Sequence, residues 1–386
     1  MAKREWRNYL RSKTRNPAFL WRMVIGILVA GVLVGLVADA FMPAWIDLEE
    51  LKLKQLQPEE IEPEPTPAGR AFEELERSAD AGAWAEVWWG IPRCMALGWT
   101  RWGAMSLAVL TGICWLAFVM QAIQPRGWRD YRLWFPLLAI GLGVASIWPT
   151  LFLIFWQERA WGLVEADDPA GGIRFFTLGV GLREEASKLI CFLPLLPWLV
   201  HRRDELAALL VAGAVGLGFA MEENVSYIWS SVGSGTLTRL MMPAPFHMAL
   251  TGLAGLAAYR ACVWPKACGP QFIAVFGVIV LAHGLYDAML MPVFEDVSIA
   301  AYGIFLVAVF QFFRELRPLQ SLRVEPISLT ANFLFCVSMV AAATFIYLSA
   351  AVGWKPAGDV LISGIMGYSA MVYLFLREMP ETMVTA

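Results

Sequence analysis

The strongest constraint on this chain is a series of apolar runs, each near the length needed to cross a membrane. A helix needs about 20 apolar residues to span the hydrocarbon core, where only helices and closed barrels satisfy their backbone polar groups. The sequence therefore predicts an all-α, polytopic transmembrane helix bundle of about ten spans. The runs lie at approximately 23–42, 103–123, 134–156, 173–200, 206–230, 243–263, 271–293, 298–313, 329–349 and 357–376.

Composition supports a membrane protein. Hydrophobic residues make up 58% of the chain and charged residues 16%, whereas soluble domains carry about 25% charged residues. The net charge is only −3, so no nucleic-acid partner is indicated, and the lipid bilayer is the partner that the composition predicts. The six cysteines show no CxxC or other zinc-type spacing, and we expect them to be buried as small hydrophobic residues.

Basic residues predict the orientation. Seven of them lie within the first 22 residues, which places the N-terminus in the cytoplasm under the positive-inside rule. Spans that alternate from there place the C-terminus in the cytoplasm as well. The loops expected outside, notably 47–80 and 158–168, are acidic. Residues 38–40 resemble a signal-peptidase site, but the preceding apolar run reaches spanning length, so we expect an uncleaved anchor.

An acidic insertion follows the first span. Residues 58–67 are rich in proline and glutamate and predict a solvated linker. Residues 70–89 are expected to form an amphipathic helix outside the membrane. Four tryptophans within 84–100 predict a segment that lies along the membrane interface as an aromatic belt.

Two adjacent carboxylates interrupt the apolar run at 173–200, namely Glu184 and Glu185, with Lys188 following. An ionised carboxylate at the centre of a membrane helix costs about 2.5–3.5 kcal/mol, so such residues indicate a functional site by default. A Glu184–Lys188 ion pair is the structural alternative, and it leaves Glu185 unexplained. Because Lys188 lies about 40° from Glu184 around the helix, we expect it to keep Glu184 rather than Glu185 ionised.

Three further apolar runs also carry polar residues. These are Glu222, Glu223 and Asn224 in 206–230, His247 in 243–263, and His283 and Asp287 in 271–293. Each set also has a purely structural interpretation. In it, one of the acids at 222 and 223 is a helix-end residue exposed to water, and His247 is a hydrogen-bonded residue at the membrane interface. His283 and Asp287 then form a structural pair. At about 1.5 Å per residue, most of these groups fall between the bilayer midplane and its outer leaflet. The sequence therefore predicts a polar cavity open to the extracytoplasmic side.

The order of these residues resembles a known family. The motifs are Glu184-Glu185-x-x-Lys188, Phe219-x-x-x-Glu223-Asn224, His247 and His283-x-x-x-Asp287. They resemble the PrsW family of intramembrane glutamic proteases, which belongs with the CAAX prenyl protease and bacteriocin-processing superfamily. The resemblance covers roughly 173–315, whereas the insertion at 44–100 has no counterpart in it. Asp287 stands where related superfamily members often have an amide.

The resemblance implies a protease of the bacterial plasma membrane that needs no metal or other cofactor. Its substrate would be a single-span or membrane-anchored protein, such as an anti-sigma factor, cut near the outer face. We accordingly expect five segments along the chain. They are 1–43 with the basic N-terminus and first span, 44–102 with the acidic extracytoplasmic region, 103–172 with two spans and an outer loop, 173–315 with the catalytic bundle, and 316–386 with two C-terminal spans.

Peptide hydrolysis gives these side chains hypothetical roles. It needs a base to activate water, an acid for the leaving amine and donors for the oxyanion. The expected catalytic residues are Glu184 or Glu185 with Glu223 at the water, and His247 or His283 at the oxyanion. The expected supporting residues are Lys188 beside the glutamates, Asp287 orienting His283, and Asn224 at the substrate backbone.

Three alternative functions are compatible with the same residues. The histidines and carboxylates are possible zinc or manganese ligands in a metal-dependent membrane hydrolase, although no HExxH motif is present. The intramembrane acids are also a possible relay in a proton- or ion-coupled transporter, although no internal repeat is evident. A non-catalytic scaffold or receptor that keeps the polar cluster for packing is a third alternative.

Overall fold

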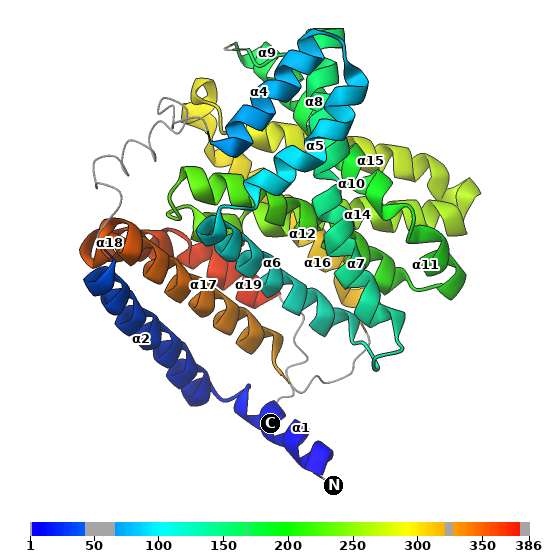
Figure 1. Cartoon of the computed structure of the whole chain (residues 1–386). Coiled ribbons are helices and arrows are strands. Elements are labelled where there is room, and N and C mark those ends of the chain that lie inside the picture. Colours follow the sequence, from blue (N-terminus) through cyan, green and yellow to red (C-terminus); the bar gives the residue numbers. More distant parts are fainter. Residues whose placement is uncertain (1, 43–65, 167, 321–326, 379–386) are drawn as a thin grey trace.

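The computed structural model describes residues 2–42, 66–166, 168–320 and 327–378, and within them every regular element is a helix (Figure 1). Most of the expected linker at 58–67 lies outside the described residues. In chain order the helices are α1 (Ala2–Lys13), α2 (Pro17–Phe41), α4 (Pro67–Asp80), α5 (Trp84–Gly98), α6 (Trp102–Ile123), α7 (Tyr131–Ala145), α8 (Ile147–Trp161), α9 (Pro169–Arg174), η1 (Phe175–Gly181), α10 (Leu182–Phe192), α11 (Leu196–Arg202), α12 (Glu205–Ser230), α13 (Thr236–Met241), α14 (Pro243–Val263), α15 (Pro265–Ala288), η2 (Pro292–Val297), α16 (Ile299–Leu319), α17 (Leu329–Val352), α18 (Trp354–Gly367) and α19 (Ser369–Glu378).

The predicted polytopic all-α bundle is confirmed. Eight helical stretches among the described residues are long and apolar enough to cross a membrane, and α18 with α19 makes a ninth if that bent pair is counted as one span. The expected span at 173–200 is not among them, because it is divided into α9, η1, α10 and α11. Pro194 removes a backbone donor between α10 and α11, and Pro197 lies in the first turn of α11. Ahead of α10, η1 is a π-helix, a form that occurs frequently at functional sites.

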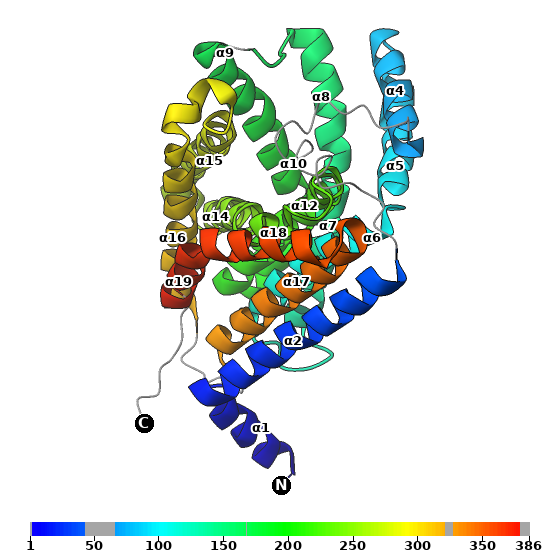
Figure 2. The same cartoon turned by 90° about the vertical axis from the view of Figure 1, so that its left-hand side faces the viewer.

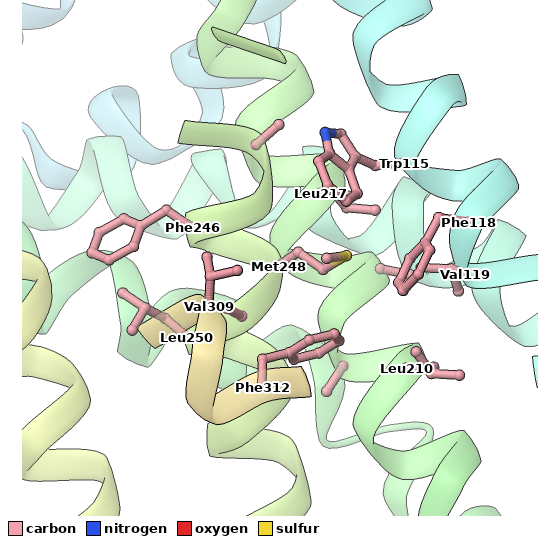
Figure 3. Close-up of a cluster of buried hydrophobic side chains, with 14 of the residues drawn as sticks. Trp115, Phe118, Val119, Leu210, Leu217, Phe246, Met248, Leu250, Val309 and Phe312 are labelled. Atoms are coloured by element: carbon pink, nitrogen blue, oxygen red, sulfur yellow. The ribbon is translucent and has the colours of Figure 1, made fainter. Parts of the chain in front are cut away.

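Helix α12 forms the centre of the molecule. Its residues from 207 to 221 are buried without interruption, as expected for a helix that is apolar on all sides. Figure 3 shows apolar side chains of α6, α14 and α16 that pack together with those of α12. The side chains labelled there are Trp115, Phe118, Val119, Leu210, Leu217, Phe246, Met248, Leu250, Val309 and Phe312.

Small residues set the distances between the central helices. A Cβ atom on Gly143 of α7 would lie 2.0 Å from the carbonyl oxygen of Val215 on α12. The two backbones are therefore in direct contact, as small residues allow in membrane bundles. At the edge of the molecule α2 lies beside α17 (Figure 2), with Gly31 of α2 against Ala342 of α17.

The segment after the acidic insertion forms two helices rather than one. The expected amphipathic helix at 70–89 is wrong, because α4 ends at Asp80 and Gly82 turns the chain with a φ of +69°. Helices α4 and α5 pack on α8, where Trp148 Nε1 donates a hydrogen bond of 2.8 Å to the carbonyl oxygen of Trp88. The location of this segment at the membrane interface stays a prediction.

Candidate active site

Four helices bring the polar residues of the apolar runs together. Glu184, Glu185 and Lys188 come from α10, and Glu223 comes from α12. His247 comes from α14, and His283 and Asp287 come from α15. The centroids of the two imidazole rings lie 5.2 Å apart. Each ring contacts a carboxylate of another helix, His247 that of Glu223 and His283 that of Glu185.

Two glycines hold these helices close enough for the contacts to form. A Cβ atom on Gly216 of α12 would come within 2.2 Å of the carbonyl oxygen of His247. A Cβ atom on Gly284 of α15 would come within 2.4 Å of Thr177 Cα in η1. The backbones of α12 and α14, and of α15 and η1, therefore touch at the level of the site. This explains why the residue beside His283 has no side chain.

Lys188 is fully buried at the centre of the cluster. Its Nζ atom lies 2.7 Å from Glu185 Oε1, 3.4 Å from Glu184 Oε2 and 2.9 Å from His247 Nδ1. The expectation that Lys188 acts on Glu184 rather than Glu185 is therefore met only in part, because Lys188 pairs with both carboxylates and lies nearer to Glu185. Its angular argument compared positions around the helix axis, whereas a long lysine side chain reaches equally well to residues three and four positions away.

The two adjacent glutamates have different surroundings. Glu185 is 1% exposed and accepts hydrogen bonds from Lys188, from His283 Nδ1 at 2.8 Å and from Thr251 Oγ1 at 3.4 Å. Glu184 lines a cavity instead, with its Oε2 3.6 Å from His283 Nε2. The different surroundings of the two side chains follow from their separation of about 100° around the helix.

The cavity has a volume of about 950 Å³ and is partly open to the outside of the protein. Its polar wall includes Glu184, Glu223, His247, His283 and Asp287. Aromatic residues form much of the remainder, namely Phe175, Phe176, Tyr227, Phe246 and Tyr286. The lining also contains Ser231, Ser234 and Gly235, which lie in the loop that the sequence predicts on the extracytoplasmic side, between the expected spans 206–230 and 243–263. Ser230, Leu290, Met291 and Pro292 of the lining lie at the ends of the expected spans 206–230 and 271–293 that are predicted on the same side.

Arg239 of α13 is a site residue that the sequence reading missed. Its guanidinium donates to Glu223 Oε2 and to Asn224 Oδ1, and it lies 4.3 Å from the centroid of the Tyr227 ring. Asn224 is fully buried and also donates to Thr111 Oγ1 at 3.2 Å. The geometry therefore fits an Asn224 that holds Arg239, and not the expected contact with a substrate backbone. The sequence feature that indicates Arg239 is its position as a basic residue in the short connection after Glu222 and Glu223.

Arg183 is a second residue that was missed, although it directly precedes the two glutamates. It lines the cavity and is 7% exposed. Its Nη1 donates to Gln157 Oε1 of α8 at 3.5 Å, and its guanidinium lies 5.7 Å from the centroid of the Phe175 ring. Glu222, in contrast, is absent from the cavity wall.

Glu184, His247 and His283 are also candidate metal ligands. Each offers one ligand atom, and the three atoms lie within 4.8 Å of one another. Two histidines and a carboxylate form a known catalytic zinc set. The partners of His247 oppose it, because a lysine ammonium only donates hydrogen bonds, so Nδ1 is the acceptor toward Lys188. Nε2 then carries the proton and donates to Glu223 at 3.2 Å, which leaves no lone pair for a metal. In this arrangement the residues do not fit a metal ion.

Comparison with known proteins identifies the family. Residues 131–313 match the model of the family described as "PrsW family intramembrane metalloprotease". The match begins earlier than the expected 173, and it takes in α7, which contacts the backbone of α12 through Gly143. No curated protein and no solved structure matches the chain. Through residues 131–313, the chain belongs to the PrsW family of intramembrane proteases.

Proposed function

We propose that this chain is an intramembrane endopeptidase that hydrolyses a peptide bond of a membrane-anchored protein by means of glutamate-activated water, without a metal. The observation that carries the proposal is that Glu184 and Glu223 line one cavity together with His247 and His283. A carboxylate base, a proton carrier and hydrogen-bond donors for an oxyanion are what peptide hydrolysis requires.

Glu184 is the proposed base. It faces the cavity, and its contacts to Lys188 Nζ and His283 Nε2 are long, at 3.4 Å and 3.6 Å. Its oxygen atoms are therefore more available than those of the enclosed Glu185. A water molecule gives its proton to Glu184 as the water oxygen bonds to the peptide carbon. Glu184 then passes that proton to the amide nitrogen as the carbon–nitrogen bond breaks.

His283 is the proposed donor to the oxyanion. Its Nδ1–H donates to Glu185, which fixes the ring, and its Nε2 lies 3.4 Å from Asp287 Oδ2 at the cavity wall. With Nε2 also protonated, His283 donates to the oxygen of the tetrahedral intermediate. Asp287 and Glu184 flank this Nε2, so the positive ring has counter-charges on both sides.

Glu223 is the proposed second carboxylate at the water. Its Oε2 accepts from both Arg239 and His247 Nε2, so the carboxylate is held in one orientation toward the cavity. Lys188 links the two halves of the site, because it contacts His247 and both α10 glutamates. Such preorganised charges cost no rearrangement during the reaction.

The proposed substrate is a single-span or otherwise membrane-anchored protein, with an anti-sigma factor as the model case. Part of the cavity lining lies in the loop 231–235 and at the outer ends of the expected spans 206–230 and 271–293, which supports cleavage near the extracytoplasmic face. We propose a bacterial plasma-membrane location with both termini in the cytoplasm, supported by the basic N-terminal segment.

The test is cleavage of a tagged single-span reporter by the full chain in proteoliposomes. The wild-type chain is expected to release a soluble fragment, and Glu184→Gln and Glu223→Gln are expected to release none. Mass spectrometry of the fragment gives the cleaved bond. Fragment release by both variants at the wild-type rate would contradict the proposal.

A metal-dependent form of the same hydrolysis is the second candidate. The closeness of donor atoms from Glu184, His247 and His283 favours it, and the hydrogen bonds of His247 oppose it. Elemental analysis of the purified protein, together with activity in a chelator, separates the two candidates.

A further inference from the structure

Arg183 has an environment that the proposed chemistry does not explain. It is 7% exposed, yet among the described residues no carboxylate oxygen lies within 4.0 Å of its guanidinium nitrogens. Its buried Nε atom has no hydrogen-bond partner. The carboxylates of Glu184, Glu158 and Asp287 act on this charge only from a longer distance. A buried charge without a directly bonded counter-charge is costly, and an unsatisfied donor adds to that cost. A group that is retained at such a cost is expected to have a ligand.

The groups in direct contact with the Arg183 guanidinium are neutral, and they hold it beside the cavity. Gln157 accepts one hydrogen bond from Nη1 at 3.5 Å and is itself fixed, since its Nε2 donates to the carbonyl oxygen of Leu178 at 3.2 Å. The guanidinium also lies over the Phe175 ring. Neutral contacts of this kind position the cation, and they leave its charge available to a molecule in the cavity.

We propose that Arg183 binds an acidic side chain of the substrate. Arginine donors pair with a carboxylate in a two-point geometry, and such a pair is strongest where water is excluded. The rest of the polar wall repels an acid, because Glu184, Glu223 and Asp287 line it. Arg239, the other guanidinium at the wall, is already paired with Glu223. An acidic residue of the substrate therefore has one favourable place in the cavity, and this fixes its distance from the cleaved bond.

The neighbours of Arg183 suggest the residues around that acid. Phe175, Phe176 and Val180 of η1 line the same cavity, and the Phe175 ring contacts the Arg183 guanidinium. A substrate segment with one Asp or Glu among apolar residues matches this wall. The inference rests on the proposed function, because it takes the cavity to be the substrate site.

The experiment measures binding, so it does not depend on hydrolysis. Fluorescent single-span reporters carry one Asp at successive positions of the outer juxtamembrane segment, each matched with an Asn reporter. They are titrated onto the full chain carrying Glu184→Gln in nanodiscs. At one position the Asp reporter is expected to bind at least about tenfold more tightly than its Asn partner, the range for a hydrogen-bonded charge pair. Arg183→Gln is expected to remove this preference, and Arg183→Lys to keep part of it.

Arg174→Gln is the matched control, because Arg174 is exposed and absent from the cavity wall. It is expected to keep the preference for Asp. Equal binding of Asp and Asn reporters at every position would overturn the inference, whether or not the wild-type chain cleaves any reporter. Competition by phosphatidylglycerol vesicles, with none by phosphatidylcholine vesicles, would also overturn it, because it would identify a lipid headgroup as the ligand. Cleavage of no reporter by the wild-type chain would count against the proposed function alone.

Discussion

The Nδ1 atom of His283 lies 2.8 Å from Oε1 of Glu185, and the same oxygen lies 2.7 Å from Nζ of Lys188. One buried carboxylate therefore fixes both a histidine that faces the cavity and a lysine that does not. This relationship indicates different roles for the two adjacent glutamates. Glu185 fixes the positions of His283 and Lys188, whereas Glu184 is available as the proposed base.

Glu185→Gln is expected to lower stability as well as activity. The substitution leaves Lys188 as a buried cation with weaker partners, and breaking a buried charge pair costs about 3–5 kcal/mol. Thermal unfolding of the detergent-solubilised protein measures the loss. The double variant Glu185→Gln, Lys188→Met is expected to be more stable than Glu185→Gln alone. A double variant that is less stable than the single one would show that the pair is not a stabilising unit.

Gly284→Ala is expected to separate α15 from η1 and to reduce activity by at least about tenfold. The added Cβ would lie 2.4 Å from Thr177 Cα, and backbone atoms move at a cost of about 1–3 kcal/mol. Gly277→Ala on the same helix is the control, because its Cβ would meet nothing within 4 Å. Reporter cleavage and unfolding temperature are compared for both variants. Equal behaviour of the two would show that close packing at Gly284 does not set the site.

Arg239→Gln is expected to reduce cleavage by about 10²-fold or less while the protein stays folded. The substitution removes the charge-assisted hydrogen bond to Glu223, which is worth about 1.5–3 kcal/mol. Arg239→Lys keeps the charge without the planar fork and is expected to recover part of the rate. The rate at saturating reporter is the measurement. A loss confined to KM would instead place Arg239 in substrate binding.

Removal of metal ions is expected to leave activity unchanged. Lys188 occupies the Nδ1 lone pair of His247, and Glu223 accepts the proton on Nε2, so that ring has no free lone pair for an ion. Activity is measured before and after dialysis against a strong chelator, and again after zinc is added. Loss with the chelator and recovery with zinc would establish the metal-dependent candidate.

The fold and the cluster were largely predictable because their signals are local. Apolar runs of spanning length predict helices, and acids or histidines inside such runs are costly enough to be conspicuous. Glu184, Glu223, His247 and His283 were found in this way, and the structure brings them together. The π-helix η1 was not found, because nothing in its apolar, glycine-containing sequence separates it from an ordinary helix.

Side-chain partners were less predictable, because they depend on which helix lies opposite. The angle around α10 favours Glu184 as the partner of Lys188, but Lys188 pairs with both glutamates. The remaining contacts come from other helices, with His247 on Lys188 and His283 on Glu185. Arg239 was missed for the same reason, because its contact with Glu223 joins α13 to α12. Contacts between elements require the packing that small residues such as Gly216 permit.

The most direct measurement compares Glu184→Gln with Glu222→Gln in the reporter cleavage assay. Both replace one glutamate carboxyl of the bundle by an amide, but Glu184 lines the cavity and Glu222 does not. Glu184→Gln is predicted to abolish release of the fragment. Glu222→Gln is predicted to keep the rate of release within about twofold of the wild-type rate, which corresponds to a change of about 0.4 kcal/mol in the activation free energy. Cleavage by Glu184→Gln at the rate of Glu222→Gln would contradict the assignment of Glu184 as the base.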